Sequence, residues 1–221
     1  MDDASAMKSA DKKSPFFLAI AGNIGVGKTT LTKLISERLS WKAYFERVIN
    51  NPYLDDFYAD MHRWSFNLQI YFLSKRFIDQ KKILDNNEPC VQDRSIYEDA
   101  EIFACILHKQ GYMSDRDYDN YRELFAIMTG YLKKPDLIIY LKASTWTLIT
   151  RIRKRGRDFE KSITTDYLHE LNEAYDDWIR RIDGKINVLQ VDADNFDYEK
   201  QPEHFEQLFE RIVPFVTGAQ S

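Results

Sequence analysis

Short, largely apolar runs alternate along this chain with longer segments that have helical periodicity. The runs predict buried strands, because a strand covered on both faces has few polar positions. Strands are expected at 16–21, 41–45, 89–92, 137–141 and 188–191. Helices are expected at 28–39, 63–85, 96–110, 115–133, 145–155, 165–182 and 202–215. The longest helix is expected to place on one face Trp64, Leu68, Tyr71, Phe72 and Ile78. Strands that alternate with helices predict an α/β fold with a parallel sheet and helices on both faces.

The length of 221 residues suits one domain with one hydrophobic core. We expect residues 1–14 to form a disordered tail and residues 15–221 to form that domain. Hydrophobic residues make up 44% of the chain and charged residues 30%, which is ordinary globular usage. This composition excludes a disordered chain, a collagen-like chain and a small disulfide-stapled protein.

The charge and the cysteines narrow the class of protein further. A net charge of −4 makes non-specific binding to nucleic acid or to an anionic membrane a poor hypothesis. The two cysteines, Cys90 and Cys105, match no zinc or redox spacing, and free thiols suit a reducing compartment. The first apolar run is too short for a signal peptide or a membrane span. We therefore expect a cytoplasmic protein with no nucleic-acid or membrane partner.

A glycine-rich loop follows the first expected strand and opens the first expected helix. It matches the pattern G-x-x-x-x-G-K-[ST] and comprises Gly22, Asn23, Ile24, Gly25, Val26, Gly27, Lys28, Thr29 and Thr30. Glycines let backbone N–H groups turn around an anion, and the helix directs its positive end to the same place. Lys28 is expected to reach the outer phosphates of a nucleotide, and the Thr29 hydroxyl to hold Mg²⁺. The alternative is a glycine-rich turn with an accidental lysine, which the flanking strand and helix make improbable.

Other motifs decide which class of phosphate-loop protein this is. None of the eight glycines has an aspartate three positions before it, and the chain contains no N-K-x-D motif. A GTPase is therefore disfavoured. The chain is also short for a motor or transporter ATPase, which leaves a small-molecule kinase.

Five cations occur within the seven residues 151–157 of this otherwise acidic chain. Arg151 and Arg155 would lie on one face of a helix, and Gly156 would end the helix before Arg157. The guanidinium fork suits phosphate oxygens, so we expect a lid over a phosphoryl group. Alternatively, these cations form a solvated helix end, where the helix dipole favours them.

Carboxylates follow two of the expected strands. Glu46 comes directly after the strand at 41–45, and Asp93 with Arg94 follows the strand at 89–92. Ligands of open α/β sheets bind at the carboxyl ends of the strands. Glu46 could accept a proton from a substrate hydroxyl, and Asp93 could hold Mg²⁺ directly or through water. Alternatively, both are ordinary polar loop residues.

In combination, these features resemble the deoxyribonucleoside kinase family. The resemblance covers nearly the whole chain after residue 16. It rests on five ordered blocks, which are 22–30, 46–48, 63–69, 93–95 and 151–157. It implies a P-loop three-layer sandwich with a five-stranded parallel sheet in the order 2-3-1-4-5 and an arginine-rich lid. It implies ATP as phosphoryl donor, Mg²⁺ as cofactor and a deoxynucleoside as acceptor.

The resemblance also implies roles for residues at the acceptor. Glu46 is the general base for the sugar 5′-hydroxyl, and Arg94 lies beside that hydroxyl. Tyr58 and Glu160 hold the 3′-hydroxyl. The residues that surround the base are Trp64 and Phe103, which pack on it, and Gln69, Arg76 and Asp99, which read its polar edge. From the residues alone, these rings could be core residues, Arg76 and Asp99 a simple ion pair, and Gln69 a solvent-facing side chain.

At the donor, the resemblance assigns Lys28, Arg151, Arg155 and Arg157 to the phosphates. Asn195 and Phe196 correspond to the loop that packs the adenine. Family members are usually dimers, so we expect a homodimer, with the helices at 96–110 and 115–133 as candidates for the contact.

One departure bears on the substrate. Many animal relatives have Glu-Arg-Ser where this chain has Asp93-Arg94-Ser95, and the aspartate form resembles microbial purine deoxynucleoside kinases. We therefore expect deoxyadenosine first, then deoxyguanosine and deoxycytidine. An ionised Asp99 only accepts hydrogen bonds, which disfavours thymine. Two alternatives remain: a nucleoside monophosphate kinase that uses Arg47 and Arg63 on the acceptor phosphate, and a nucleotide-sensing protein without turnover.

Overall fold

The computed structural model describes residues 14–46, 51–198 and 201–218. Its centre is a sheet of five parallel strands in the order β2-β3-β1-β4-β5, as expected. The strands are β1 (Phe17–Gly22), β2 (Lys42–Tyr44), β3 (Cys90–Asp93), β4 (Leu137–Lys142) and β5 (Asn187–Asp192). All six residues of β1 are buried, because this strand lies in the middle of the sheet with helices on both sides.

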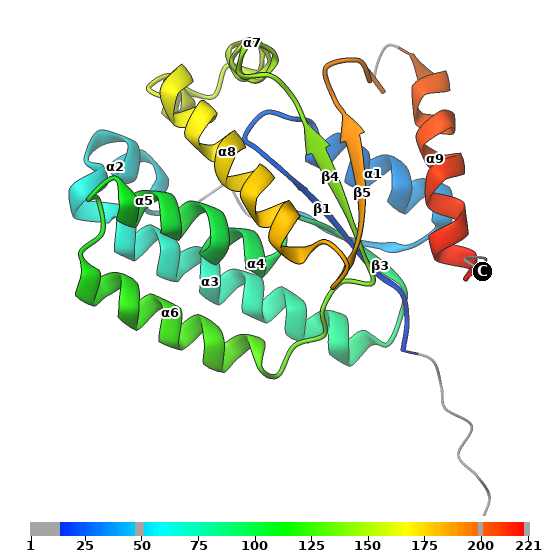
Figure 1. Ribbon diagram of the computed structural model, residues 1–221, viewed down its shortest axis with the longest axis horizontal. Helices are drawn as coiled ribbons and strands as arrows, with labels where there is room; N and C mark the ends of the chain where they lie inside the picture. Colours follow the sequence, from blue (N-terminus) through cyan, green and yellow to red (C-terminus); the bar gives the residue numbers. More distant parts are fainter. Residues whose placement is uncertain (1–13, 47–50, 199–200, 219–221) are drawn as a thin grey trace, which may run out of the picture.

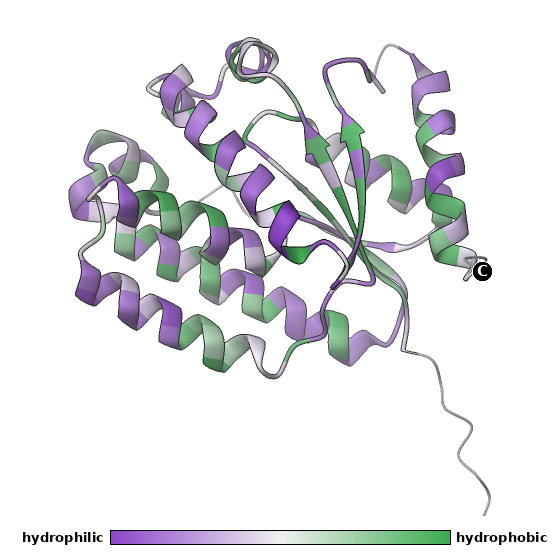
Figure 2. Cartoon of the chain, viewed as in Figure 1, coloured by the Kyte–Doolittle hydropathy of each residue, from purple (hydrophilic) through white to green (hydrophobic). Residues whose placement is uncertain are grey.

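Helices cover both faces of the sheet and complete three layers (Figure 1). They are α1 (Lys28–Leu39), α2 (Leu54–Ala59), α3 (Met61–Asn86), α4 (Ile96–Glu98), the π-helical segment η1 (Asp99–Ala104), α5 (Cys105–Lys109), α6 (Asp115–Thr129), α7 (Thr145–Arg155), the short 3₁₀ segment η2 (Asp158–Glu160), α8 (Thr165–Ile182) and α9 (Pro202–Thr217). Helices α1 and α9 lie on one side, and α3, α5, α6 and α8 lie on the other (Figure 1). Strands β1 and β4 are apolar along most of their length (Figure 2).

The parallel register brings the carboxyl ends of three strands together. Ile20 of β1 lies opposite Asp93 of β3, and Tyr44 of β2 lies opposite Gln92. The phosphate loop, Glu46 and Arg94 therefore leave the sheet at one edge. In open parallel sheets, ligands bind outside the carboxyl ends of the strands, so we expect the site there.

Three local features differ from the sequence-based expectation. Helix α2 was not expected, and the helix expected at 96–110 is interrupted by η1. Ile78 was expected on the buried face of α3, but it is 43% exposed. The buried side of α3 carries the polar residues Gln69, Arg76 and Gln80 instead, so a pattern of apolar residues alone places this face wrongly.

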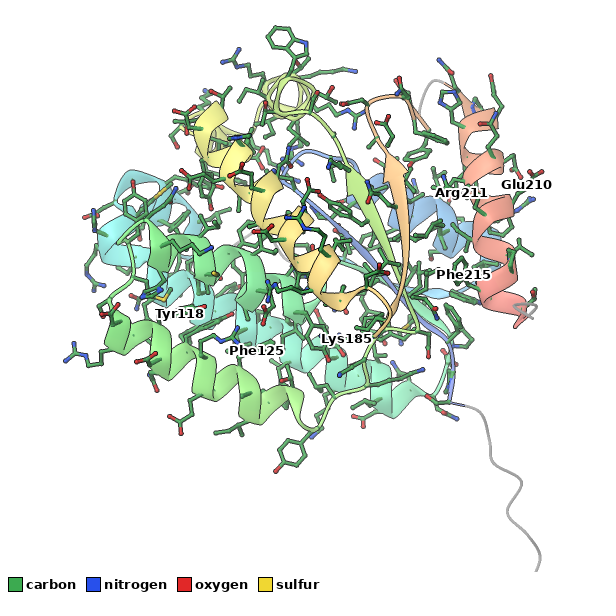
Figure 3. All side chains as sticks on the ribbon, in the orientation of Figure 1. Tyr118, Phe125, Lys185, Glu210, Arg211 and Phe215 are labelled. Atoms are coloured by element: carbon green, nitrogen blue, oxygen red, sulfur yellow. The ribbon has the colours of Figure 1, made fainter. Side chains whose placement is uncertain are left out.

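The inner side of α6 shows how the helical layer packs. Phe125 joins a buried cluster with Tyr121 and Leu73, and the ring of Tyr118 stacks on His108 (Figure 3).

Within the described ranges, no helix is both long and apolar enough to span a bilayer. Residues 1–13 of the expected tail lie outside the described residues.

Candidate active site

A cavity of about 910 Å³ opens at the carboxyl ends of the strands. Of the residues that the sequence singled out, it is lined by Ile24, Gly25, Val26, Gly27, Lys28, Thr29, Thr30, Glu46, Tyr58, Gln69, Arg94, Asp99, Phe103, Arg151, Arg155, Arg157, Glu160 and Phe196. The structure thus brings together side chains that are up to 172 positions apart in sequence, from Ile24 to Phe196. The other predicted residues do not line it; they are Gly22, Asn23, Trp64, Arg76, Asp93 and Asn195.

The phosphate loop needs glycine where the backbone passes close to other elements. Gly22 has φ +144°, and a Cβ there would lie 2.6 Å from the Leu141 carbonyl oxygen. Gly25 has φ +80°, and a Cβ there would lie 2.7 Å from Ile152 Cγ1 of α7. Both contacts are too close for any side chain. The loop is therefore pressed against β4 and α7, which fixes its shape.

Lys28 is buried beneath this loop. Its Nζ donates to the carbonyl oxygens of Gly22 and Asn23, each at 2.9 Å. Burial lowers the pKa of Lys28 to about 8, and the nearby positive charge of Arg94 adds to this effect. The ammonium group is therefore held inside the loop by the carbonyl oxygens of its first two residues.

Thr29 and Asp93 present oxygen atoms to one another at the start of α1. Thr29 Oγ1 donates to Asp93 Oδ2 at 2.5 Å. Asp93 Oδ1 is buried and has no hydrogen-bond partner among the described residues. A buried carboxylate oxygen without a partner costs free energy, and hard cations such as Mg²⁺ bind such oxygens. This pair therefore fits the predicted magnesium site, although no cluster of three or more acidic, histidine or cysteine ligands occurs in the described part of the chain.

Glu46 is held by two arginines. Arg76 Nη2 donates to Glu46 Oε1 at 2.6 Å, and Arg94 Nε lies 3.0 Å from the same oxygen. Burial alone would raise the pKa of Glu46, but the charges of Arg94 and Arg76 outweigh it and lower the pKa to about 2. Glu46 is therefore an ionised acceptor at neutral pH.

Arg94 adopts a left-handed backbone conformation, with φ +65°. Such a conformation is uncommon outside glycine and costs about 1–3 kcal/mol, so surrounding contacts must hold it. The Arg94 guanidinium lies over the Phe103 ring at 4.4 Å, and its Nη1 donates to the Tyr175 hydroxyl at 2.7 Å.

Gln69 and Asp99 both line the cavity with polar side chains. Asp99 Oδ2 accepts from Arg76 Nε at 3.2 Å, and burial raises the pKa of Asp99 to about 6 despite this cation. Gln69 is only 3% exposed, so it does not face solvent, and its Oε1 has no hydrogen-bond partner in the described ranges. Arg76 and Asp99 do form an ion pair, and Asp99 lines the cavity at the same time.

Glu160 and Tyr58 lie together near the lid. Glu160 is buried and accepts from Arg155 Nη2 at 2.6 Å, from Arg155 Nε at 3.1 Å and from Arg157 Nη1 at 3.4 Å. The Tyr58 ring is nearly parallel to that of Phe159, with centroids 6.2 Å apart. Burial raises the pKa of Tyr58 well above its usual value, so its hydroxyl remains a donor.

The three lid arginines have different partners. Arg151 Nη1 donates to the Val26 carbonyl and Nη2 to the Ala193 carbonyl, both at 2.8 Å. Arg151 thus joins the phosphate loop to the segment after β5. Arg155 and Arg157 are both bound to Glu160 and partly exposed, so they can turn toward a ligand.

Two predicted residues lie away from the cavity. Trp64 packs against Tyr53 at 5.9 Å, with the Arg63 guanidinium 4.3 Å from its ring, in the cluster around Leu54 and Phe57. The exposed Asn195 donates to Asp192 Oδ2 at 2.7 Å.

Sequence reasoning missed several residues in or behind the site. Phe159 and Tyr167 line the cavity, whereas Glu98 and Tyr175 lie behind it. Tyr167 and Tyr175 are eight positions apart on α8 and share its buried face. That face is apolar throughout in sequence, so the pattern predicts burial and gives no sign that Tyr175 binds Arg94.

Comparisons with known proteins identify the family of this chain. The model of the deoxynucleoside kinase family matches residues 18–217. A deoxyadenosine/deoxycytidine kinase of Bacillus subtilis is 40% identical over 205 residues, 92% of this chain and 94% of that protein. A deoxyadenosine kinase of Dictyostelium discoideum is 42% identical over 179 residues, 81% of this chain and 73% of that protein. The structure of a deoxyadenosine kinase from M. mycoides with bound dATP is similar at TM-score 0.79 and 31% identity, covering 89% of this chain and 99% of that one. The phosphate loop and these matches together place the chain in the deoxynucleoside kinase family.

Proposed function

We propose that this deoxynucleoside kinase transfers the γ-phosphoryl group of ATP to the 5′-hydroxyl of deoxyadenosine, in preference to deoxyguanosine and deoxycytidine. The order among these three rests on the resemblance of Asp93-Arg94-Ser95 to microbial purine deoxynucleoside kinases. The observation that disfavours thymidine is the presence of two polar side chains, Gln69 and Asp99, in the cavity. Gln69 Oε1 has no partner in the described part of the chain, and the Asp99 carboxylate lies in the same pocket.

These acceptors favour a base that carries an amino group. At neutral pH the Asp99 carboxylate is ionised even with its pKa raised to about 6, so it only accepts hydrogen bonds. Adenine offers its exocyclic amine, whereas thymine offers a carbonyl oxygen at the corresponding edge. Two facing acceptors cost roughly 1–3 kcal/mol when buried. The relatives that act on deoxyadenosine support ranking this substrate first.

Glu46 takes the proton of the 5′-hydroxyl as the oxygen attacks the γ-phosphorus. Its pKa of about 2 makes it a weak base, which suits a loose transition state in which the proton leaves late. Arg94 lies beside Glu46, with its Nε 3.0 Å from Glu46 Oε1, and it lines the same cavity, so its guanidinium can donate to the 5′-oxygen. Lys28 and the lid residues Arg155 and Arg157 stabilise charge on the phosphates.

Thr29 and Asp93 are the residues that would hold Mg²⁺. When bound there, the ion would neutralise phosphate charge. Asp93 is 1% exposed, and Thr29 lies in the first turn of α1, directly beside the phosphate loop. The two oxygen ligands would therefore lie next to the terminal phosphates of a nucleoside triphosphate.

We also propose that the protein is a cytoplasmic homodimer in which α6 contributes to the contact. Leu124 is 39% exposed and Ile127 57% exposed on α6, and Tyr131 just beyond the helix is 78% exposed. Apolar residues gather in the carboxyl-terminal half of α6 (Figure 2). An exposed apolar helix face is typical of a protein interface.

The test is a comparison of kcat/KM for the four natural deoxynucleosides, with ATP and Mg²⁺. We expect deoxyadenosine to exceed deoxyguanosine and deoxycytidine, and thymidine to be the poorest. Asp99→Asn gives an amide that can also donate, so it should raise the thymidine-to-deoxyadenosine ratio about tenfold. Deoxyadenosine monophosphate serves as the control acceptor for the monophosphate-kinase alternative. Of the two arginines that alternative uses, Arg63 does not line the cavity, and Arg47 lies outside the described residues. A wild-type preference for thymidine, or faster use of the monophosphate, would contradict the proposal.

A further inference from the structure

Two fully buried polar residues lie behind the site, and neither lines the cavity. Tyr175 of α8 and Glu98 of α4 are both 0% exposed. A carboxylate and a hydroxyl at this depth destabilise the fold unless their hydrogen bonds are made. The partners of these two groups therefore indicate why they are there.

The Tyr175 hydroxyl joins a cation to an anion. Arg94 Nη1 donates to Tyr175 Oη at 2.7 Å, and Tyr175 Oη donates to Glu98 Oε2 at 2.8 Å. A guanidinium group only donates, so the direction of both bonds is fixed. Burial raises the pKa of Tyr175 well above its usual value, which keeps the hydroxyl proton in place.

Glu98 connects the same hydroxyl to the phosphate loop. Its Oε2 also accepts from the backbone N–H of Gly22 at 3.3 Å, at the first glycine of the loop. Its Oε1 accepts from Ser95 N at 2.8 Å and from Ser95 Oγ at 3.3 Å. One carboxylate thus binds the end of β1, the turn after β3 and α8.

Arg94 continues the chain of contacts to Glu46, whose Oε1 lies 3.0 Å from Arg94 Nε. We propose that Tyr175 and Glu98 are positioning residues for phosphoryl transfer: they fix Arg94, and through it the Glu46 carboxylate, relative to the phosphate loop. The inference rests on the role proposed above for Glu46. It gives a physical link between the donor side and the acceptor side of the reaction.

Loss of the Tyr175 hydroxyl has a definite structural consequence. Arg94 Nη1 would then face Glu98 Oε2 directly, across the present distance of 3.9 Å. A guanidinium that moves to close this gap withdraws from Glu46. Displacing a reacting group by about 1 Å costs on the order of 10²-fold in rate, and removing an outer-shell partner typically costs about 10–100-fold.

The first test is Tyr175→Phe, which removes one oxygen and keeps the ring that packs on Tyr140 and Phe103. The readout is the single-turnover rate of phosphoryl transfer at saturating ATP and deoxyadenosine, measured beside the Kd of each substrate. We expect the rate to fall about 10–100-fold, with both Kd values within threefold of wild type.

Tyr140→Phe is the matched control. Tyr140 is 1% exposed, its ring stacks on Tyr175 with centroids 5.7 Å apart, and its hydroxyl donates to Asp176 rather than to the Arg94 chain. Tyr140→Phe removes a hydroxyl from the neighbouring buried ring and is expected to change the rate less than twofold. Equal losses of rate in the two variants would overturn the proposal, because general loosening of the core would then explain both.

Glu98→Gln tests the link to the phosphate loop. An amide has one accepting oxygen in place of two, so it cannot accept from Ser95 at one end and from Gly22 and Tyr175 at the other. We expect a higher Kd for ATP together with a lower rate. The double variant Glu98→Gln with Tyr175→Phe should be no slower than Glu98→Gln alone, because both changes break the same series of hydrogen bonds. Multiplicative losses would contradict the link. Should Glu98→Gln fail to fold, the comparison of Tyr175→Phe with Tyr140→Phe decides alone.

Glu46→Gln separates this inference from the proposed function. A Glu46→Gln enzyme with the wild-type rate would refute the role of Glu46 itself. A slow Glu46→Gln enzyme beside a Tyr175→Phe enzyme of wild-type rate would keep that role and refute only the positioning by Tyr175.

Discussion

One guanidinium group, that of Arg76, joins the Glu46 carboxylate to the Asp99 carboxylate. Its Nη2 donates to Glu46 Oε1 at 2.6 Å, and its Nε donates to Asp99 Oδ2 at 3.2 Å. Its Nη1 donates to the Asp93 carbonyl oxygen at 2.9 Å. Arg76 does not itself line the cavity, so it acts through the two carboxylates. The two carboxylates to which we assign base selection and phosphoryl transfer therefore share one structural support.

Arg76→Lys should impair both of these properties. A single ammonium cannot reproduce the fork that reaches three acceptors at once. We expect kcat for deoxyadenosine to fall about 10–100-fold and the preference over thymidine to shrink. Steady-state kinetics with both nucleosides measure this. A variant that changes selectivity while keeping wild-type kcat would show that Arg76 does not support Glu46.

The burial of Asp99 predicts a pH-dependent stability. Its pKa is about 6 in the fold against 3.8 in the unfolded chain. Between pH 3.8 and pH 6 this carboxyl is ionised in the unfolded chain but not in the fold, so wild type loses stability as pH rises, and the loss persists above pH 6. Asp99→Asn cannot ionise. Its free energy of unfolding minus that of wild type should therefore grow by roughly 2 kcal/mol between pH 4.5 and pH 7.5. Urea unfolding at both pH values measures the difference. An equal difference at both would contradict the raised pKa.

Lys28 predicts a pH-dependent affinity for ATP. Its pKa is about 8 in the empty enzyme, chiefly because the ammonium is buried. The charge is present below pH 8 and is lost as pH rises through this value, so the Kd for ATP should rise up to about tenfold per pH unit above it. Titration calorimetry from pH 7 to pH 9.5 tests this. The control is Lys28→Met, in which this rise should vanish and binding should be weak throughout.

The lid arginines should separate into two classes. Arg151 binds the Val26 and Ala193 carbonyls, so Arg151→Ala should lower Tm by about 3–8 °C and raise KM for ATP. Arg155 binds only Glu160, among its described partners, and is partly exposed. Arg155→Ala should lower kcat about 10–100-fold and leave Tm within about 2 °C of wild type. Thermal unfolding and steady-state kinetics of both variants decide whether this division holds.

The fold could be predicted because its signals are local. The phosphate loop has a fixed spacing, and the runs that form β1 and β4 are apolar at nearly every position. Helix α2 was missed because six residues with two aspartates carry little periodicity. Segment η1 was missed because a π-helical turn has no pattern of its own and differs from an α-helix only in backbone hydrogen bonding.

The site could be predicted only where a motif or a resemblance marked it. Glu46 and Arg94 follow strand ends, so their place at the cavity was foreseeable. Gln69 and Arg76 lie on the buried face of α3, where an apolar pattern would predict leucine or valine. Tyr175 looks like a core aromatic in sequence, and only its contact with Arg94 shows another role. Long-range hydrogen bonds between buried polar groups depend on packing, which no local pattern encodes.

The most direct test of Glu46 as the general base is the single-turnover rate of Glu46→Gln with ATP and deoxyadenosine. The amide keeps the size of the side chain and can still accept from Arg76, but it cannot take the 5′-hydroxyl proton. We predict a rate lower by about 10²–10⁴-fold, with the Kd for deoxyadenosine within threefold of wild type. Glu46→Asp, which keeps a carboxylate at shorter reach, should recover part of the rate. A Glu46→Gln enzyme that binds deoxyadenosine weakly but turns over at the wild-type rate would contradict the account.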